Sequence, residues 1–360
     1  MKRLVRDPFR FDGFSLFATY GQKASVSLKD PASVGGFIAA VKASAERALS
    51  NEAFLFGQRT EALFERVVAS LGGCRLLKRE DVGDVFHTAE TDVQPPDFRI
   101  VLEDGKQLLV EVKNFHQGDA PTKQQRESRA YLDALVGYAD LMGCELRMAT
   151  YWCQWNRWTL VPLSAFSQGE KWSTLSMPDA IVANEMNRLG DLLVGTRAPL
   201  RFRVNADRSK PRTIEANGQA GFTIGSCELL SEDRHITDPV ELRIAWFLLL
   251  YGDWVIRDST LIAEGDQLVA IEHHVGPSEE RAEVEDQDFE FIGALSSMIS
   301  RAHNSSTGDG GQVDRIRADF EPGAVGALIP EDYEGKALPL WRFIIEPTHE
   351  KPGPVSESPG

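Results

Sequence analysis

The chain has 360 residues and a formal net charge of −15, and its content of 42% apolar and 26% charged residues is typical of a globular protein with one or two domains. No run approaches the roughly 18 apolar residues that cross a bilayer, and no apolar stretch follows the basic residues of the N-terminus, so we expect neither a membrane span nor a secretory signal. The excess acidity lies at one end, because residues 220–360 carry a net charge of −17 while residues 1–219 carry +2.

Two helices are predicted in the first part of the chain. Apolar residues at helical spacing predict a helix at 34–49, which ends an N-terminal helical lead-in at 1–50. A second amphipathic pattern predicts a helix at 53–71, and Gly72 with the glycine after it ends that helix.

A strand at 75–78 and a β-hairpin at 97–114 follow. Apolar residues alternate on both arms of the hairpin, at 98–102 and 108–112, and an Asp-Gly turn at 104–105 joins the arms. One face of each arm is therefore expected to be buried.

A helix at 123–141 and two strands at 145–152 and 158–163 complete a core at 51–165. The expected order is helix, strand, hairpin, helix, strand and strand, which belongs to the α/β class. A basic connecting segment at 166–219 follows this core.

The remainder predicts an acidic α/β C-terminal domain at 220–346. Its expected elements are a helix at 238–251, a hairpin at 258–274 and an amphipathic helix at 288–301. The tail at 347–360 is rich in Pro, Glu, Ser and Gly and predicts disorder.

Side chains of the first hairpin have the chemistry of a metal site. Asp97 opens the first arm, and Glu111 and Lys113 lie two residues apart on the second arm, so they project from the same face. Mg²⁺ prefers carboxylate and carbonyl oxygens, which Asp97, Glu111 and the backbone carbonyl of Val112 would supply. Phosphodiester hydrolysis needs such a metal, and Lys113 adds a cation for the phosphate.

Pro96-Asp97, followed after thirteen residues by Glu111-Val112-Lys113, resembles the PD-(D/E)xK superfamily of restriction-endonuclease-like nucleases. Upstream, Gly57 and Glu61 are similar to the glycine and glutamate of the first helix in Holliday-junction-resolvase-like members. The resemblance covers about residues 53–165. It implies a restriction-endonuclease-like α-β-β-β-α-β core in which Glu61 joins the metal site, with Glu65, one helical turn later, as the alternative.

This resemblance implies a metal-dependent endonuclease that uses Mg²⁺, with Mn²⁺ as a substitute, and acts on DNA rather than RNA. A prokaryotic setting such as phage defence, restriction or mobile-element processing is implied by the same analogy. The implied catalytic residues are Asp97, Glu111, Lys113 and Glu61, and the implied metal ligands are Asp97, Glu111, Val112 and Glu61. Lys123, Arg126 and Arg129 would open the helix at 123–141 and contact the nucleic-acid backbone, the alternative being a solvated helix face.

Two other hypotheses remain open. The chain is either a non-cleaving nuclease-fold subunit whose acidic C-terminal domain docks a protein partner, or an acidic mimic of nucleic acid built from residues 220–360. The apolar stripe of the helix at 288–301 either is buried within its own domain or forms a homodimer interface. The basic stretch at 201–212 is either a backbone contact or ordinary loop charge. Four cysteines without a CxxC pair predict reduced thiols in a cytoplasmic protein.

Overall fold

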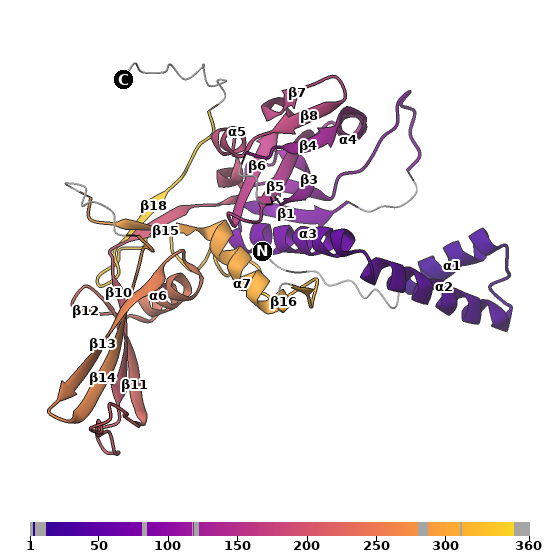
Figure 1. Ribbon diagram of the computed structural model, residues 1–360. Coiled ribbons are helices and arrows are strands. Elements are labelled where there is room, and N and C mark those ends of the chain that lie inside the picture. Colours follow the sequence, from indigo (N-terminus) through magenta and orange to yellow (C-terminus); the bar gives the residue numbers. More distant parts are fainter. Residues whose placement is uncertain are drawn as a thin grey trace.

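The computed structural model describes residue 3 and residues 12–80, 85–116, 118, 122–279, 287–309 and 312–348. Helices alternate with strands along the chain, and the strands form several sheets (Figure 1), which confirms the α/β class. Within this part of the chain, no helix has both the length and the apolar character needed to cross a membrane. The predicted disordered tail lies outside the described residues from position 349 on.

Two N-terminal helices form a hairpin that projects from the rest of the molecule (Figure 1). They are α1 (Asp12–Ala24) and α2 (Pro31–Leu49), so the helix predicted at 34–49 is confirmed. Phe17 of α1 packs against Phe37 of α2, with ring centroids 5.3 Å apart. This aromatic contact holds the two helices side by side.

The next elements build a five-stranded sheet. In chain order they are α3 (Glu52–Leu71), β1 (Cys74–Arg79), β2 (Phe98–Leu102), β3 (Gln107–Phe115), α4 (Arg129–Met142), β5 (Glu145–Trp152) and β6 (Arg157–Pro162). The strand order is β1-β2-β3-β5-β6, in which β3 and β5 are parallel and the other neighbours are antiparallel. The sheet and its two helices follow one another along the chain in the predicted order of helix, strand, hairpin, helix and two strands.

Helices α3 and α4 cover opposite faces of the sheet, and β3 contributes to both contacts. Val110 and Val112 lie in the buried cluster that contains the apolar residues of α3, whereas Leu109 lies in the cluster of α4. Because successive side chains of a strand point to opposite faces, Glu111 and Lys113 share the α4 side with Leu109.

The helix predicted at 123–141 starts later than expected, so its first part is a wrong prediction. Strand β4 (Gln125–Ser128) occupies that part and forms a small sheet with β8 (Trp172–Leu175) and β7 (Ser167–Gln168). The side-chain oxygen of Gln125 is buried and accepts a hydrogen bond from Thr150 at 2.8 Å. Lys123 and Arg126 therefore precede the helix, and only Arg129 belongs to it, because pairing with a distant strand holds this stretch extended.

The segment 166–219, predicted to connect two domains, contributes strands to three sheets. Its elements and the short helix before it are η1 (Leu163–Ala165), β7, β8, α5 (Met177–Val182), η2 (Met186–Leu189), β9 (Leu193–Thr196) and β10 (Leu200–Ala206). The division of the chain into domains stays a prediction.

A second five-stranded sheet is entirely antiparallel. It contains β10, β11 (Ile224–Ser231), β12 (Arg234–His235), β13 (Val255–Glu264) and β14 (Gln267–Gly276), in the order β12-β11-β10-β14-β13. Helix α6 (Pro239–Tyr251) precedes its last hairpin, so the helix at 238–251 and the hairpin at 258–274 are confirmed. Strands β11, β13 and β14 extend as an arm away from the first sheet (Figure 1).

The helix predicted at 288–301 is wrong in its first half. This stretch begins as β15 (Glu290–Ala294), and only then does α7 (Leu295–Thr307) start. Strand β9 pairs with both β15 and β18 (Leu340–Phe343), and the ring of Phe289 stacks on that of Trp341 at 5.0 Å. Strand partners that are distant in sequence therefore select an extended backbone where local periodicity indicates a helix.

A short pair of strands, β16 (Gly308–Asp309) and β17 (Gln312–Val313), follows α7.

The apolar stripe of this stretch is buried inside the chain. Its core members are Ile292, Leu295, Met298 and Ile299. Of the two alternatives for the stripe, internal burial is the one observed, and the stripe is not available to a second subunit.

The basic stretch at 201–212 is bonded to acidic residues of the same sheet. Arg203 lies 2.6 Å from a carboxylate oxygen of Glu272, and Arg201 lies 3.3 Å from the other oxygen of that side chain. Arg208 lies 3.4 Å from Glu264. These pairs offset part of the acidity of the C-terminal region.

His303 of α7 is buried where α7 packs on α3. It is 1% exposed, and neither ring nitrogen has a hydrogen-bond partner among the described residues. Burial, together with the charges of Arg66 and Arg59, lowers the pKa of His303 to about 4. The folded protein therefore keeps this imidazole neutral at mildly acidic pH.

We expect His303→Leu to lose less stability on acidification than the wild type. Between pH 6.5 and pH 4 the unfolded chain binds a proton at His303 that the folded chain does not, so the free energy of unfolding falls as the pH decreases through this window. In urea unfolding at pH 7 and pH 5, the wild-type decrease should exceed that of the variant by about 1–2 kcal/mol. The exposed His87 provides the control His87→Leu, which should follow the wild type, and equal decreases in all three proteins would contradict the prediction.

Candidate active site

The antiparallel pairing of β2 and β3 brings Asp97 and Glu111 together. Phe98 pairs with Val110, and extending this register by one pair places Asp97 opposite Glu111. Oδ2 of Asp97 accepts a hydrogen bond from the backbone N–H of Val112 at 2.7 Å. This bond fixes the carboxylate of Asp97 beside β3.

Glu111, Lys113 and Tyr131 form a closed hydrogen-bonded triangle. Nζ of Lys113 donates to Oε1 of Glu111 at 2.8 Å and to the hydroxyl of Tyr131 at 2.7 Å. The Tyr131 hydroxyl in turn donates to the same oxygen of Glu111. Glu111 is only 5% exposed, so these two donors satisfy a charge that would otherwise be costly to bury.

Tyr131 is the site residue that sequence reasoning did not identify. It lies in the first turn of α4, where its backbone N–H donates to the hydroxyl of the N-cap residue, Ser128, at 3.2 Å. A Ser three residues before Tyr131 is the local signal of that cap. The periodicity that starts the helix at 123 hides this signal, because it places Tyr131 in the middle of the helix.

Glu61 approaches the cluster from α3. Its carboxylate accepts hydrogen bonds from Gln58 at 2.8 Å and from Arg79 at 2.8 Å, and Arg79 also binds Glu65 at 3.0 Å. Of the two glutamates, Glu61 is the one whose charge acts on Asp97. This favours Glu61 as the third carboxylate and leaves its role a prediction.

Asp97 is the electrostatically strained member of the site. Burial and, next in size, the charge of Glu111 raise the pKa of Asp97 to about 7, and Glu61 adds to the increase. The Val112 N–H and the Lys113 ammonium act in the opposite direction and do not cancel the increase. Burial and the Glu111 carboxylate also raise the pKa of the Tyr131 hydroxyl, so Tyr131 remains a proton donor.

The carboxylates of Asp97, Glu111 and Glu61 lie close together without enough positive charge to balance them, and such a cluster suits a hard divalent cation. Carboxylate oxygens, a backbone carbonyl and water are the donors that Mg²⁺ takes, and Asp97 and Glu111 supply the first kind. Among the described residues, however, no three His, Cys, Asp or Glu side chains are arranged as a ready group of metal ligands. In this arrangement Glu61 is bonded to Arg79, and Glu111 is bonded to Lys113.

The three residues predicted to contact a nucleic-acid backbone surround the end of β3 and the start of α4. Nζ of Lys123 donates to the backbone carbonyl of His116 at 3.1 Å. The guanidinium of Arg126 lies 5.0 Å from the ring centroid of Trp172. Arg129 is the first residue of α4. Within the described residues none of these three cations is paired with a carboxylate.

No protein-family model matches the chain, and no curated protein matches its sequence. Among solved structures, the chain is similar to Hjc, a Holliday junction resolvase from the archaeal hyperthermophile Archaeoglobus fulgidus. The identity is 16%, the TM-score is 0.26, and the match covers 35% of this chain and 96% of the resolvase. A similarity this low does not assign a family, so the chemistry has to be inferred from the geometry of the site.

We expect Asp97→Asn to stabilise the metal-free protein at pH 8. Because the pKa of Asp97 is raised to about 7, the folded chain carries an unfavourable charge above that pH, and an amide removes this charge while its oxygen still accepts the Val112 N–H. Urea unfolding in EDTA should give a free energy of unfolding higher by about 1–2 kcal/mol, and the gain should shrink as the pH falls below 7. The exposed Asp104 provides the control Asp104→Asn, which should be neutral. A destabilised Asp97→Asn at pH 8 would show that the site is not electrostatically strained.

Proposed function

We propose that the chain is a metal-dependent nuclease that hydrolyses phosphodiester bonds of nucleic acid, DNA rather than RNA. One observation carries this proposal: Asp97, Glu111 and Lys113 meet at one place on the sheet, where burial and the nearby carboxylates raise the pKa of Asp97. Carboxylates with a purely structural role normally have enough cationic partners to stabilise their charge. A site with an excess of negative charge instead suits a cation that binds during function. The order of α3, β1, β2, β3, α4 and β5 is also the one that a restriction-endonuclease-like core requires.

In this proposal Asp97 and Glu111 would hold Mg²⁺, with Mn²⁺ as a substitute, and Glu61 and the backbone carbonyl of Val112 would complete the ligand set. The bound cation neutralises phosphate charge and makes water more acidic. Glu61 would be a ligand once released from Arg79, which would still have Glu65 as a partner.

Lys113 acts on the phosphate side of the reaction. Its ammonium is held by Glu111 and Tyr131, so it has a fixed position from which to donate to a phosphate oxygen or to an attacking water. Tyr131 positions this ammonium from α4, on which Arg129 also lies. Arg126 and Lys123, outside the helix, supply further charge for the backbone of the nucleic acid.

The second candidate is a nuclease-fold subunit that binds nucleic acid without cleaving it. The observation that favours it is that Glu61 and Glu111 are already neutralised by Arg79 and Lys113. A binding subunit would retain salt-sensitive affinity for nucleic acid and would show no turnover with any divalent metal.

We expect Lys113→Ala to reduce Mg²⁺-dependent cleavage of plasmid or single-stranded DNA by at least about 10³-fold, because it removes the cation that faces the scissile phosphate. The rate of product formation at saturating Mg²⁺ measures this effect, and EDTA should abolish cleavage by the wild type. Lys106→Ala is the matched control, since Lys106 is exposed in the turn of the same hairpin, where it pairs with Asp104. Cleavage by Lys113→Ala at the wild-type rate would refute the assigned site, and a wild type that binds DNA but never cleaves it would favour the binding subunit.

A further inference from the structure

A cavity of about 350 Å³ lies at the end of β3, and part of its wall comes from α3 and β3, which also carry residues of the candidate active site. Arg59 lines the cavity from α3, two residues before Glu61. Asn114 and His116 line it from the end of β3 and the residue after it, just beyond Lys113. Because Asn114 shares the α3 face of β3 with Val112, a molecule bound in this cavity would lie on that face, one residue along the strand from Lys113, whose side chain points to the α4 face.

Arg59 gives the cavity an uncompensated positive charge. Its guanidinium donates to the hydroxyl of Thr307 at 2.9 Å and to the backbone carbonyl of Asn304 at 3.3 Å, and both acceptors are neutral. It has no carboxylate partner in the described part of the chain, and partial burial lowers its pKa. In a chain with a net charge of −15, an arginine left without an acid inside a cavity is a binding group for an anion.

A second free cation borders the same end of β3. Nζ of Lys123 donates to the carbonyl of His116, one of the lining residues, and lies 5.6 Å from the ring centroid of Phe115. It too is without a carboxylate partner within the described ranges. Arg59 in the cavity and Lys123 near His116 therefore place two positive charges at this end of β3.

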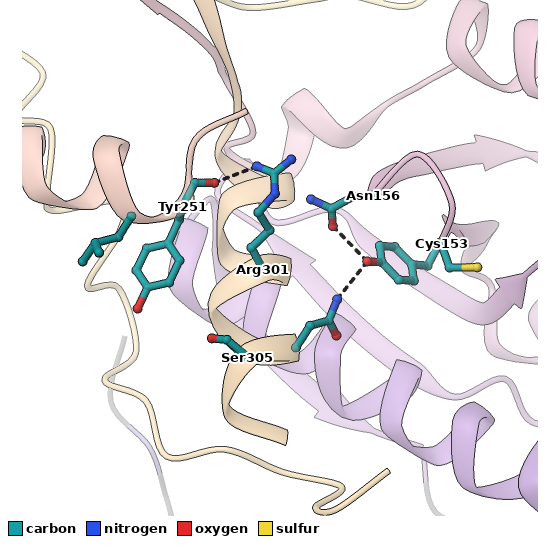
Figure 2. Close-up of a pocket in the computed structure, with 8 residues that line it drawn as sticks. Cys153, Asn156, Tyr251, Arg301 and Ser305 are labelled. Atoms are coloured by element: carbon teal, nitrogen blue, oxygen red, sulfur yellow. Dashed lines mark hydrogen bonds between the residues drawn. The ribbon is translucent and has the colours of Figure 1, made fainter. Parts of the chain in front are cut away.

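Aromatic side chains form two of the walls. Phe56 lines the cavity from α3, and Tyr151 lines it from β5. The Tyr151 hydroxyl donates to Asn156 at 2.8 Å and accepts from Asn304 at 3.1 Å (Figure 2), so this wall is held rigidly. The volume lies near the lower end of the roughly 300–1,000 Å³ of small-ligand sites, a size that suits one nucleotide.

A neighbouring cavity of about 430 Å³, whose lining residues are drawn in Figure 2, shares Tyr151, Cys153 and Asn304 with the first. Its cation is Arg301, which donates to the carbonyl of Tyr251 at 2.7 Å and is paired with Asp253. Because Asp253 neutralises Arg301, this second cavity lacks the free charge that an anion needs. The observations therefore favour the cavity of Arg59.

We propose that the cavity lined by Phe56, Arg59 and His116 binds one unpaired nucleotide of the substrate, with its base against Phe56 and its phosphate at Arg59. A base within a duplex is paired and stacked and cannot enter such a hollow, whereas an unpaired base can. This inference rests on the proposed nuclease function and specifies its substrate class, which is nucleic acid with a single-stranded portion.

Binding without cleavage tests the proposal. Fluorescence anisotropy of the full chain in EDTA compares a labelled DNA of about 20 nucleotides, longer than the roughly 4–16 that one single-strand site covers, with the same DNA as a duplex. The wild type should bind the single strand at least about tenfold more tightly than the duplex. Arg59→Met and Phe56→Ala should each weaken single-strand binding about tenfold, as expected for one phosphate contact or one stacked base, and should leave duplex binding nearly unchanged.

Control variants test whether the effects are specific to this cavity. Arg208→Met removes the same charge at an exposed position that pairs with Glu264 on the second sheet, and it should bind as the wild type does. Ser305→Ala alters the neighbouring cavity and should also have no effect. Arg59→Lys and Phe56→Tyr retain the charge and the ring, and they should restore most of the single-strand affinity.

The proposal is overturned if single strand and duplex bind equally well, or if folded Arg59→Met and Phe56→Ala bind the single strand as the wild type does. Circular dichroism identifies a variant that does not fold. If Arg59→Met or Phe56→Ala fails to fold, the single-strand affinities of Arg59→Lys and Phe56→Tyr are compared with those of Arg59→Gln and Phe56→Leu, which should be lower. A parallel assay with Mg²⁺ separates the two proposals. Single-strand preference that depends on Arg59 without any cleavage supports the nucleotide site and counts against the nuclease function.

Discussion

Strand β3 runs through the middle of the first sheet, and helices cover both of its faces, so the site around it depends on the two-residue alternation of its side chains. Val110 and Val112 have to face α3, and Glu111 and Lys113 are thereby placed in the interior on the α4 side. A shift of register by one residue would bury the valines on the wrong side and lose the pairing of Asp97 with Glu111. Because burying charge is costly, the helix that covers this face has to supply a polar partner, and Tyr131 is that partner.

The two halves of the chain differ in how their charges are paired, and the net charge of the whole chain does not show this difference. In the second sheet, acids and bases are mutually satisfied, as in the contacts of Glu272 with Arg201 and Arg203. Around β3 and the start of α4, by contrast, Lys123 and Arg59 bond only to neutral oxygens within the described part of the chain. A phosphate backbone is drawn to unneutralised cations, and the second sheet, with its paired charges, extends away from them as a separate arm (Figure 1). An overall charge of −15 is therefore compatible with a local site for nucleic acid.

Prediction from the sequence succeeded where elements are long and locally consistent. The helix up to Leu71, the hairpin after Asp97 and the strands at 145–152 and 157–162 have apolar periodicity, caps and turns that agree with the folded state. It failed at 125–128 and 290–294, where β8 and β9 impose strand pairing on stretches whose apolar spacing is helical. Pairing partners 40 or more residues away leave no trace in a local window, so neither error could be corrected from periodicity. The failure at 125–128 also hid Tyr131, since the true start of α4 was not visible.

The sequence by itself determined which side chains share a face. Asp97, Glu111 and Lys113 follow from the period of a strand and the reach of an Asp-Gly turn, both of which are properties of the local backbone. Only the tertiary structure decided what surrounds them, because Tyr131 and Arg79 come from elements that are brought to the hairpin by packing. The pKa of Asp97 belongs to the same category, since burial and the proximity of Glu111 raise it and neither quantity exists in the unfolded chain.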